Sequence, residues 1–222
     1  MKGLFVTFEG TEGSGKTTQI FLLAERLRSM GLIARTLREP GGTPIGEEIR
    51  HTLKHSPDNH AMTPEAELLL MNASRAQLVR EVIRPALAAG EVVLCDRFYD
   101  STTAYQGYGR QLDLRMVKNI IDVAVGDTRP DVTLLFIIPL EVSEVRRLAR
   151  QPTLDLRFQR DRMEEADRSF FTRVAEGYQA IAAAEPQRVR QLDAAGEVAT
   201  TQAAIWELVR PLLACVTTRA AG

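Results

Sequence analysis

The chain has 222 residues, of which 45% are hydrophobic, and 28 Lys and Arg residues against 29 Asp and Glu residues give a formal net charge of −1. This balance argues against a general nucleic-acid binder, and the hydrophobic content argues against a disordered chain. The longest apolar run, Val132 to Leu140, is too short to cross a bilayer. With two cysteines and no signal-peptide cleavage pattern, we expect one domain, 1–222, in the cytoplasm, without a disulfide framework or a membrane partner.

Short apolar runs alternate with segments of helical periodicity along the whole chain. The runs predict strands, and apolar residues spaced three and four apart predict helices. The predicted strands are 4–9, 33–37, 91–96, 131–138 and 189–192, and the predicted helices are 17–30, 45–54, 63–84, 114–125, 141–149, 170–184 and 197–214. This alternation predicts an α/β fold with a largely parallel sheet and helices on both faces.

Two segments carry additional signals. Thr63 and Pro64 form a good helix start, and the helix that they begin is expected to bend or end at Pro85. The segment 155–168 contains four arginines and five acidic residues. It is interpreted either as a solvated helix face or as a mobile charged lid.

The segment GTEGSGKT at 10–17 has the form G-x-x-x-x-G-K-T and joins a predicted strand to a predicted helix. This context is typical of a P-loop, in which backbone N–H groups and a helix N-terminus bind nucleotide phosphates. Lys16 is expected to contact the β- and γ-phosphates, and the Thr17 hydroxyl is expected to bind Mg²⁺. The predicted nucleotide-binding residues are Gly10, Glu12, Gly13, Ser14, Gly15, Lys16, Thr17 and Thr18.

Asp96 ends the predicted strand 91–96, and Arg97 follows it. The carboxyl ends of parallel strands form the ligand crevice, where a carboxylate can hold Mg²⁺ through water and an arginine suits a second phosphate. Arg38 lies at the same edge, and the alternative interpretation of Asp96 and Arg97 is a surface ion pair. Two phosphate sites indicate a kinase whose acceptor is a phosphate, which needs no general base because it is already ionised.

Five segments together resemble bacterial thymidylate kinases: GTEGSGKTT at 10–18, REPGGT at 38–43, AELLLMNASRAQ at 66–77, DRF at 96–98 and STTAYQG at 101–107. The resemblance extends over nearly the whole chain. It implies a three-layer P-loop kinase fold with a five-stranded parallel sheet flanked by helices, and a homodimer. It also implies transfer of the γ-phosphoryl group of ATP to dTMP with Mg²⁺, which gives ADP and dTDP for dTTP synthesis in DNA replication.

The resemblance also implies roles for individual side chains. Glu12 matches the acid that binds the sugar 3′-hydroxyl, and Arg97, with Arg38, matches the clamp on the acceptor phosphate. The remaining substrate-binding positions are Arg75 at the thymine O4, Thr102 and Gln106 at the base edge, Tyr105 near the sugar, and Arg50 as a further pocket arginine.

A basic residue is also expected in the lid. Some members of the family have this residue in the P-loop, but the corresponding position here is Gly13. The resemblance therefore implies a lid at about 150–168, with Arg162 as the catalytic arginine and Arg157 and Arg160 as alternatives. Catalytic roles are thus expected for Lys16, Asp96, Arg97 and Arg162, and the loop at 192–196 is expected to pack on adenine.

Met71 departs from the family pattern, which has an aromatic residue there to stack on thymine. Methionine can cover a ring but is more flexible, or it can simply belong to the helix core. The interpretations are a dTMP kinase with weaker stacking and a kinase for another monophosphate such as dUMP. A third hypothesis, a nucleotide-dependent switch protein, would leave the arginines at 38 and 97 without a purpose.

Overall fold

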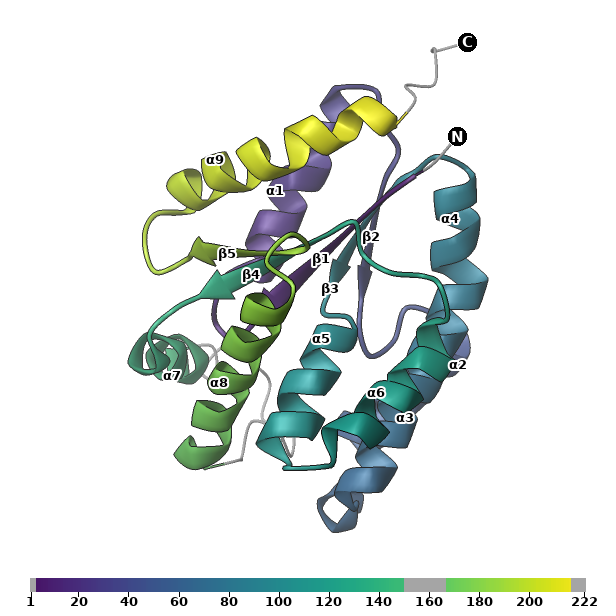
Figure 1. Cartoon of the computed structure of the whole chain (residues 1–222), viewed down its shortest axis with the longest axis vertical. Helices are drawn as coiled ribbons and strands as arrows, with labels where there is room; N and C mark the ends of the chain where they lie inside the picture. Colours follow the sequence, from purple (N-terminus) through teal and green to yellow (C-terminus); the bar gives the residue numbers. More distant parts are fainter. Residues whose placement is uncertain (1–2, 150–166, 217–222) are drawn as a thin grey trace.

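In the part of the chain that the structure describes, residues 3–149 and 167–216 of a computed structural model, five strands form one parallel sheet (Figure 1). Their order is β2-β3-β1-β4-β5, and each neighbouring pair is parallel. The strands are β1 (Leu4–Gly10), β2 (Ala34–Arg38), β3 (Val92–Asp96), β4 (Val132–Ile137) and β5 (Val189–Asp193). The predicted five-stranded parallel sheet is confirmed.

Helices connect successive strands and cover both faces of the sheet (Figure 1). They are α1 (Lys16–Ser29), α2 (Pro44–Lys54), α3 (Pro64–Leu78), α4 (Arg84–Ala88), α5 (Tyr99–Thr102), α6 (Leu114–Val125), α7 (Leu140–Ala149), α8 (Arg168–Ala184) and α9 (Val198–Val209). Shorter helical segments are the 3₁₀-helices η1 (Asn59–Ala61) and η5 (Arg210–Cys215) and the π-helices η2 (Val79–Ile83) and η3 (Thr103–Gly109). No helix among the described residues is long and apolar enough to span a membrane.

The side chains of β1 alternate between two hydrophobic cores. Leu4, Val6 and Phe8 pack in a core with residues of α1 and α9. Phe5 points to the opposite face, into a core with residues of α3 and α6. This alternation follows from the two-residue period of a strand. The central strand therefore joins the two helical layers and sets the P-loop at its carboxyl end.

The helix that begins at α3 runs further than expected. Thr63 caps it by accepting a hydrogen bond from the Ala66 N–H at 3.3 Å. The chain then stays helical through η2 and α4, beyond Pro85. A π segment shifts the hydrogen-bond pattern, and Pro85 lies in the first turn of the next helix, where its missing N–H is tolerated.

Residues 99–109 form α5 and η3, which the sequence patterns do not predict. The segment is rich in threonine, tyrosine and glycine, which are weak helix formers. The segment is stabilised instead by close packing of η3 against α8. A Cβ at Gly177 would lie 2.8 Å from the ring of Tyr108, so only glycine fits this contact without displacement.

The predicted lid at 150–168 lies almost entirely outside the described residues, which resume at Asp167. Arg157, Arg160 and Arg162 therefore lie outside them too. Asp167 is the N-cap of α8, since its Oδ1 accepts a hydrogen bond from the Phe170 N–H at 2.8 Å.

Candidate active site

The loop between β1 and α1 has the geometry expected of a P-loop. Gly13 and Gly15 have positive φ angles of 75° and 89°, which glycine adopts without steric cost. The Lys16 Nζ donates to the carbonyl oxygens of Gly10 at 3.1 Å and Thr11 at 2.9 Å. The ammonium group is therefore held within the loop, beside the N-terminus of α1, where anions are favoured.

The charge of Lys16 depends on what surrounds it. Burial, together with the positive charge of Arg97, lowers the pKa of Lys16 to about 8, against the opposite effect of Asp96 and Glu12. A negative charge within a few ångströms favours the charged form of a lysine. A phosphate chain bound in this loop would therefore raise the pKa of Lys16.

Thr17 and Asp96 are 79 residues apart in the sequence and in contact in the structure, since the Thr17 Oγ1 donates to the Asp96 Oδ2 at 3.1 Å. Their proximity arises because β3 pairs with β1 and ends beside the first turn of α1. A hydroxyl and a carboxylate are hard oxygen donors, which suit Mg²⁺ when water and substrate phosphates complete its coordination. The described residues contain no group of three or more His, Cys, Asp or Glu side chains that could hold a metal ion.

Arg97 follows β3 and lies beside the P-loop. It has a positive φ of 68°, and its Nη1 donates to the Gly10 carbonyl at 3.2 Å and to the Ser101 Oγ at 3.1 Å. Its guanidinium carbon is 5.0 Å from the centre of the Tyr105 ring. Because Lys16 donates to the same Gly10 oxygen, the two cations are neighbours.

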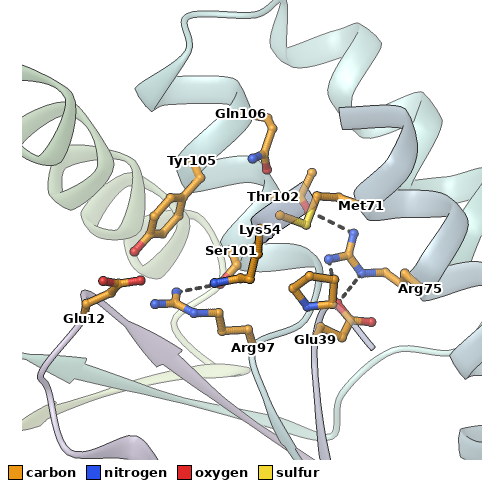
Figure 2. A pocket seen from close by; sticks show the side chains of 11 residues that line it. Glu12, Glu39, Lys54, Met71, Arg75, Arg97, Ser101, Thr102, Tyr105 and Gln106 are labelled. Carbon is orange, nitrogen blue, oxygen red and sulfur yellow. Dashed lines mark hydrogen bonds and ion pairs between the residues drawn. The ribbon is translucent and has the colours of Figure 1, made fainter. Parts of the chain in front are cut away.

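A pocket opens next to Arg97 (Figure 2). Seven of the nine predicted substrate-binding residues line it. The complete lining is Glu12, Glu39, Pro40, Lys54, Met71, Arg75, Arg97, Ser101, Thr102, Tyr105 and Gln106.

Arg38 and Arg50 are the two predicted residues outside this lining. The Arg38 Nη2 donates to both carboxylate oxygens of Glu47, at 3.1 Å and 3.0 Å. The Arg50 Nη1 donates to the Pro40 carbonyl at 2.9 Å and so supports the wall of the pocket from behind. Their direct contact with a substrate stays a prediction.

Arg75 is 2% exposed and is surrounded by acceptors of the protein itself. Its Nη1 donates to the Thr102 Oγ1 and to the Asn72 Oδ1, each at 2.9 Å, and its Nη2 is 2.7 Å from the Glu39 Oε2. Burial raises the pKa of Glu39 to about 7, against the opposing effect of Arg75. Through its hydrogen bond to the Thr102 hydroxyl, Arg75 orients Thr102 on the pocket wall.

Gln106 is fixed from behind by a buried acid. Its Nε2 donates to the Glu67 Oε1 at 2.8 Å, and the Arg110 Nη2 donates to the Glu67 Oε2 at 3.0 Å. A carboxylate can only accept hydrogen bonds, so the Gln106 amide must direct its NH₂ group toward Glu67. A pyrimidine edge in the pocket would meet an amide held in one orientation.

Tyr105 brings a buried hydroxyl group to the pocket. Among the described residues this hydroxyl has no hydrogen-bond partner, and Figure 2 shows it directed toward Glu12. Burial raises the pKa of Tyr105 to about 12, so the phenol stays protonated and can donate. A buried polar group of this kind suits a hydrogen bond to a ligand.

Several residues of the site are not identified by the sequence reasoning. Ser101 and Glu39 lie inside the motifs that it uses, and Glu9 directly precedes the P-loop as an acid in an apolar run. Lys54 and Tyr178 carry no comparable signal. The same holds for Arg146, whose guanidinium donates to carbonyl oxygens of the P-loop and of the loop after β5: Gly13 at 3.3 Å, Ala194 at 3.3 Å and Ala195 at 3.1 Å.

Comparison with known proteins points to one family. A family model described as thymidylate kinase matches residues 8–205. A thymidylate kinase of Pseudomonas fluorescens (strain SBW25) is 49% identical over 213 residues, which cover 96% of this chain and 98% of that protein. One of Synechococcus sp. (strain JA-2-3B'a(2-13)) is 47% identical over 214 residues, with the same coverage of 96% and 98%.

A solved structure gives the same result at the level of the fold. The crystal structure of thymidylate kinase from Ehrlichia chaffeensis matches with a TM-score of 0.74 and 29% sequence identity, over 95% of this chain and 99% of that chain. The chain is thus similar to these enzymes over nearly its full length, in sequence and in fold. The chain belongs to the thymidylate kinase family.

Proposed function

We propose that this chain transfers the γ-phosphoryl group of ATP to the phosphate of dTMP, giving ADP and dTDP for dTTP synthesis in DNA replication. Phosphorylation of dTMP is the reaction of its family. The observation that carries the proposal is the Gly10 carbonyl, which accepts from the Lys16 Nζ at 3.1 Å and from the Arg97 Nη1 at 3.2 Å. Two cations that meet at one oxygen can hold a donor phosphate and an acceptor phosphate next to each other.

This arrangement suits in-line transfer between two phosphates. The acceptor oxygen is already ionised near neutral pH, so the reaction needs positioning and charge stabilisation rather than a general base. Lys16 neutralises charge on the β- and γ-phosphates, and Arg97 holds the acceptor phosphate. Mg²⁺, held by Thr17 and Asp96, would supply further positive charge at the donor phosphates when bound.

The pocket beside Arg97 suits a deoxypyrimidine. Thr102 and Gln106 are proposed to face the base edge, and Arg75 is proposed to reach the thymine O4. Glu12 and Tyr105 are proposed to face the sugar, where a carboxylate accepts from a hydroxyl and a phenol ring can exclude a 2′-hydroxyl. Support comes from the lining of the pocket, which includes all five side chains.

Other roles are proposed on the resemblance. Arg38 and Arg50 are assigned to the acceptor side, and Arg162, which lies outside the described residues, is assigned to the transferring phosphoryl group. The P-loop residues are assigned to ATP, and the chain is assigned to one kinase domain acting in the cytoplasm.

A homodimer is part of the same proposal. Leu69 on α3 is 55% exposed and Val123 on α6 is 78% exposed. Exposed apolar side chains on two helices that pack together suit a protein interface, because burying them against a second copy removes them from water.

The test of the reaction is ADP release from Mg·ATP with different acceptors. We expect strong release with dTMP and weaker release with dUMP, ribothymidine monophosphate, dCMP and dGMP. Release that favours dUMP would indicate that Met71 has changed the base preference. Equal release without any acceptor would contradict the proposed kinase and favour a nucleotide switch.

Replacing Met71 with phenylalanine is expected to lower the KM for dTMP about two- to tenfold, because an aromatic ring stacks on a base better than a flexible thioether. Met71 lines the pocket one helical turn before Arg75 (Figure 2). Steady-state kinetics with varied dTMP measures the effect. The variant Met71→Leu is the control of similar volume and should leave KM within about twofold; an unchanged or raised KM in the phenylalanine variant would contradict the stacking role.

A further inference from the structure

Glu9, which no step of the proposed reaction uses, is a fully buried carboxylate at the end of β1. Its Oε1 accepts from the backbone N–H groups of Phe98 at 2.7 Å and Ser101 at 3.3 Å. Its Oε2 accepts from the Ser101 hydroxyl at 2.6 Å and from the Tyr178 hydroxyl at 2.9 Å. Four donors from three residues thus converge on one carboxylate.

The backbone of the adjacent Arg97 is in a strained conformation. Its φ of 68° lies in the left-handed region, which non-glycine residues rarely adopt. Hydrogen bonds on both sides hold it there. The Arg97 N–H donates to the Phe8 carbonyl at 3.0 Å, and the next N–H, that of Phe98, donates to Glu9.

The far end of the Arg97 side chain depends on the same carboxylate. The Arg97 Nη1 donates to the Ser101 Oγ at 3.1 Å and to the Tyr178 OH at 3.4 Å. Both hydroxyls are themselves bonded to the Glu9 Oε2, and to each other at 3.0 Å. Glu9 therefore orients the backbone that carries the guanidinium and the two hydroxyls that hold it.

The surroundings of Glu9 shift its pKa. Burial and the negative charge of Asp100 raise the pKa of Glu9, against the smaller opposing effects of its hydrogen bonds and of the charge of Arg97. Asp100 does not share the role, because its carboxylate is directed to Arg188 at 2.6 Å and to the Thr133 hydroxyl at 3.2 Å. Two buried acids in the same region thus have separate partners.

We propose that Glu9 is the positioning residue of Arg97 and that it acts through the Phe98 N–H and the hydroxyls of Ser101 and Tyr178. The role rests on the proposed function, in which Arg97 binds the acceptor phosphate. Glu9 touches neither substrate. Without it, the arginine would keep its charge but lose the geometry that directs it at the phosphate.

The variants Glu9→Gln and Tyr178→Phe test this role by calorimetric binding of dTMP and of thymidine, which lacks the phosphate. We expect the Kd of dTMP to rise about tenfold or more, since a displacement near 1 Å at a binding group can cost up to a hundredfold. The Kd of thymidine should stay within about twofold, because the base and sugar contacts are unaffected. The KM for ATP should change equally little.

The matched control is Tyr99→Phe, at a neighbouring buried tyrosine. It should leave the ratio of dTMP to thymidine affinity unchanged. Combining Glu9→Gln with Arg97→Met should add little to the effect of Arg97→Met alone, because both changes disable the same group.

Equal loss of dTMP and thymidine affinity would overturn the proposal, since it would indicate general damage to the pocket. Unchanged dTMP affinity in Tyr178→Phe would overturn the proposal too. If Glu9→Gln does not fold, the result for Tyr178→Phe alone decides whether the proposal stands. When the unmodified chain phosphorylates dTMP, these results overturn only the role of Glu9. A lack of dTMP phosphorylation by the unmodified chain would overturn the proposed function together with this role.

Discussion

Replacing Lys16 with methionine is expected to lower kcat about a thousandfold, because the variant removes a preorganised charge at the transferring phosphoryl group. Methionine has a similar length and retains the apolar contacts of the stem. The ammonium donates to the carbonyl oxygens of Gly10 and Thr11, so it lies within the loop that would hold the phosphates. ADP release at saturating ATP and dTMP measures the effect.

The matched control is Lys118→Met, at an exposed lysine on α6 that pairs with Asp122 at 2.6 Å. An exposed pair of this kind contributes little, so kcat should remain within about twofold. A decrease of less than about tenfold in Lys16→Met would contradict the assignment of this lysine to the transition state.

Lys16 also predicts a pH dependence of ATP binding. Its pKa is about 8 in the ligand-free protein, and a bound phosphate chain raises it. Below that pH the lysine is already charged, so affinity is constant. Above it, binding must take up a proton, and Kd should rise about tenfold per pH unit. Calorimetry with ATP from about pH 7 to about pH 9.5 measures this slope. The prediction would be contradicted if the wild type showed no such slope, or if Lys16→Met still showed it.

Replacing Arg97 with methionine is expected to raise the Kd of dTMP about a hundred- to thousandfold, because loss of a partly buried charge from a phosphate site costs several kcal/mol. Thymidine affinity should change far less, since thymidine has no phosphate for Arg97 to bind. Arg97→Lys should recover only part of the loss, because lysine retains the charge without the planar fork. Calorimetry with both ligands separates these effects.

The control for Arg97 is Arg35→Met, at an arginine in β2 whose Nε is 2.7 Å from Glu91. It should leave both affinities within about twofold, because Arg35 lies near the start of β2, at the opposite end of the strand from the site. A parallel loss of dTMP and thymidine affinity in Arg97→Met would indicate a packing role instead. Unchanged dTMP affinity would move the acceptor phosphate elsewhere, with Arg38 as the next candidate.

The strands and the P-loop are predictable from the sequence because their signals are local. Each buried strand is a short apolar run between polar segments, and β1 reads as such a run up to Gly10. The P-loop depends on consecutive residues from Gly10 to Thr17, whose backbone forms the phosphate cradle. The contact of Thr17 with Asp96 also follows from a general rule, since the carboxyl ends of parallel strands meet at one edge.

Two helical segments are harder to predict because tertiary packing outweighs local preference. Residues 99–109 are helical despite weak propensity, since η3 packs against α8 where Gly177 leaves room for Tyr108. The helix that contains Pro85 continues because the π segment before it changes the hydrogen-bond pattern. Neither effect is visible in the spacing of apolar residues.

The sequence by itself determined the fold class and the P-loop, because contiguous motifs and strand periodicity encode them, and its resemblance to a known family supplied most of the residues that line the pocket beside Arg97. Only the tertiary structure decided how these groups are held. It gave Arg38 a partner in Glu47 and joined Glu9 to Tyr178, which is 169 residues away. Contacts of that kind depend on burial and on which donors converge in three dimensions, and no local pattern in the sequence records either.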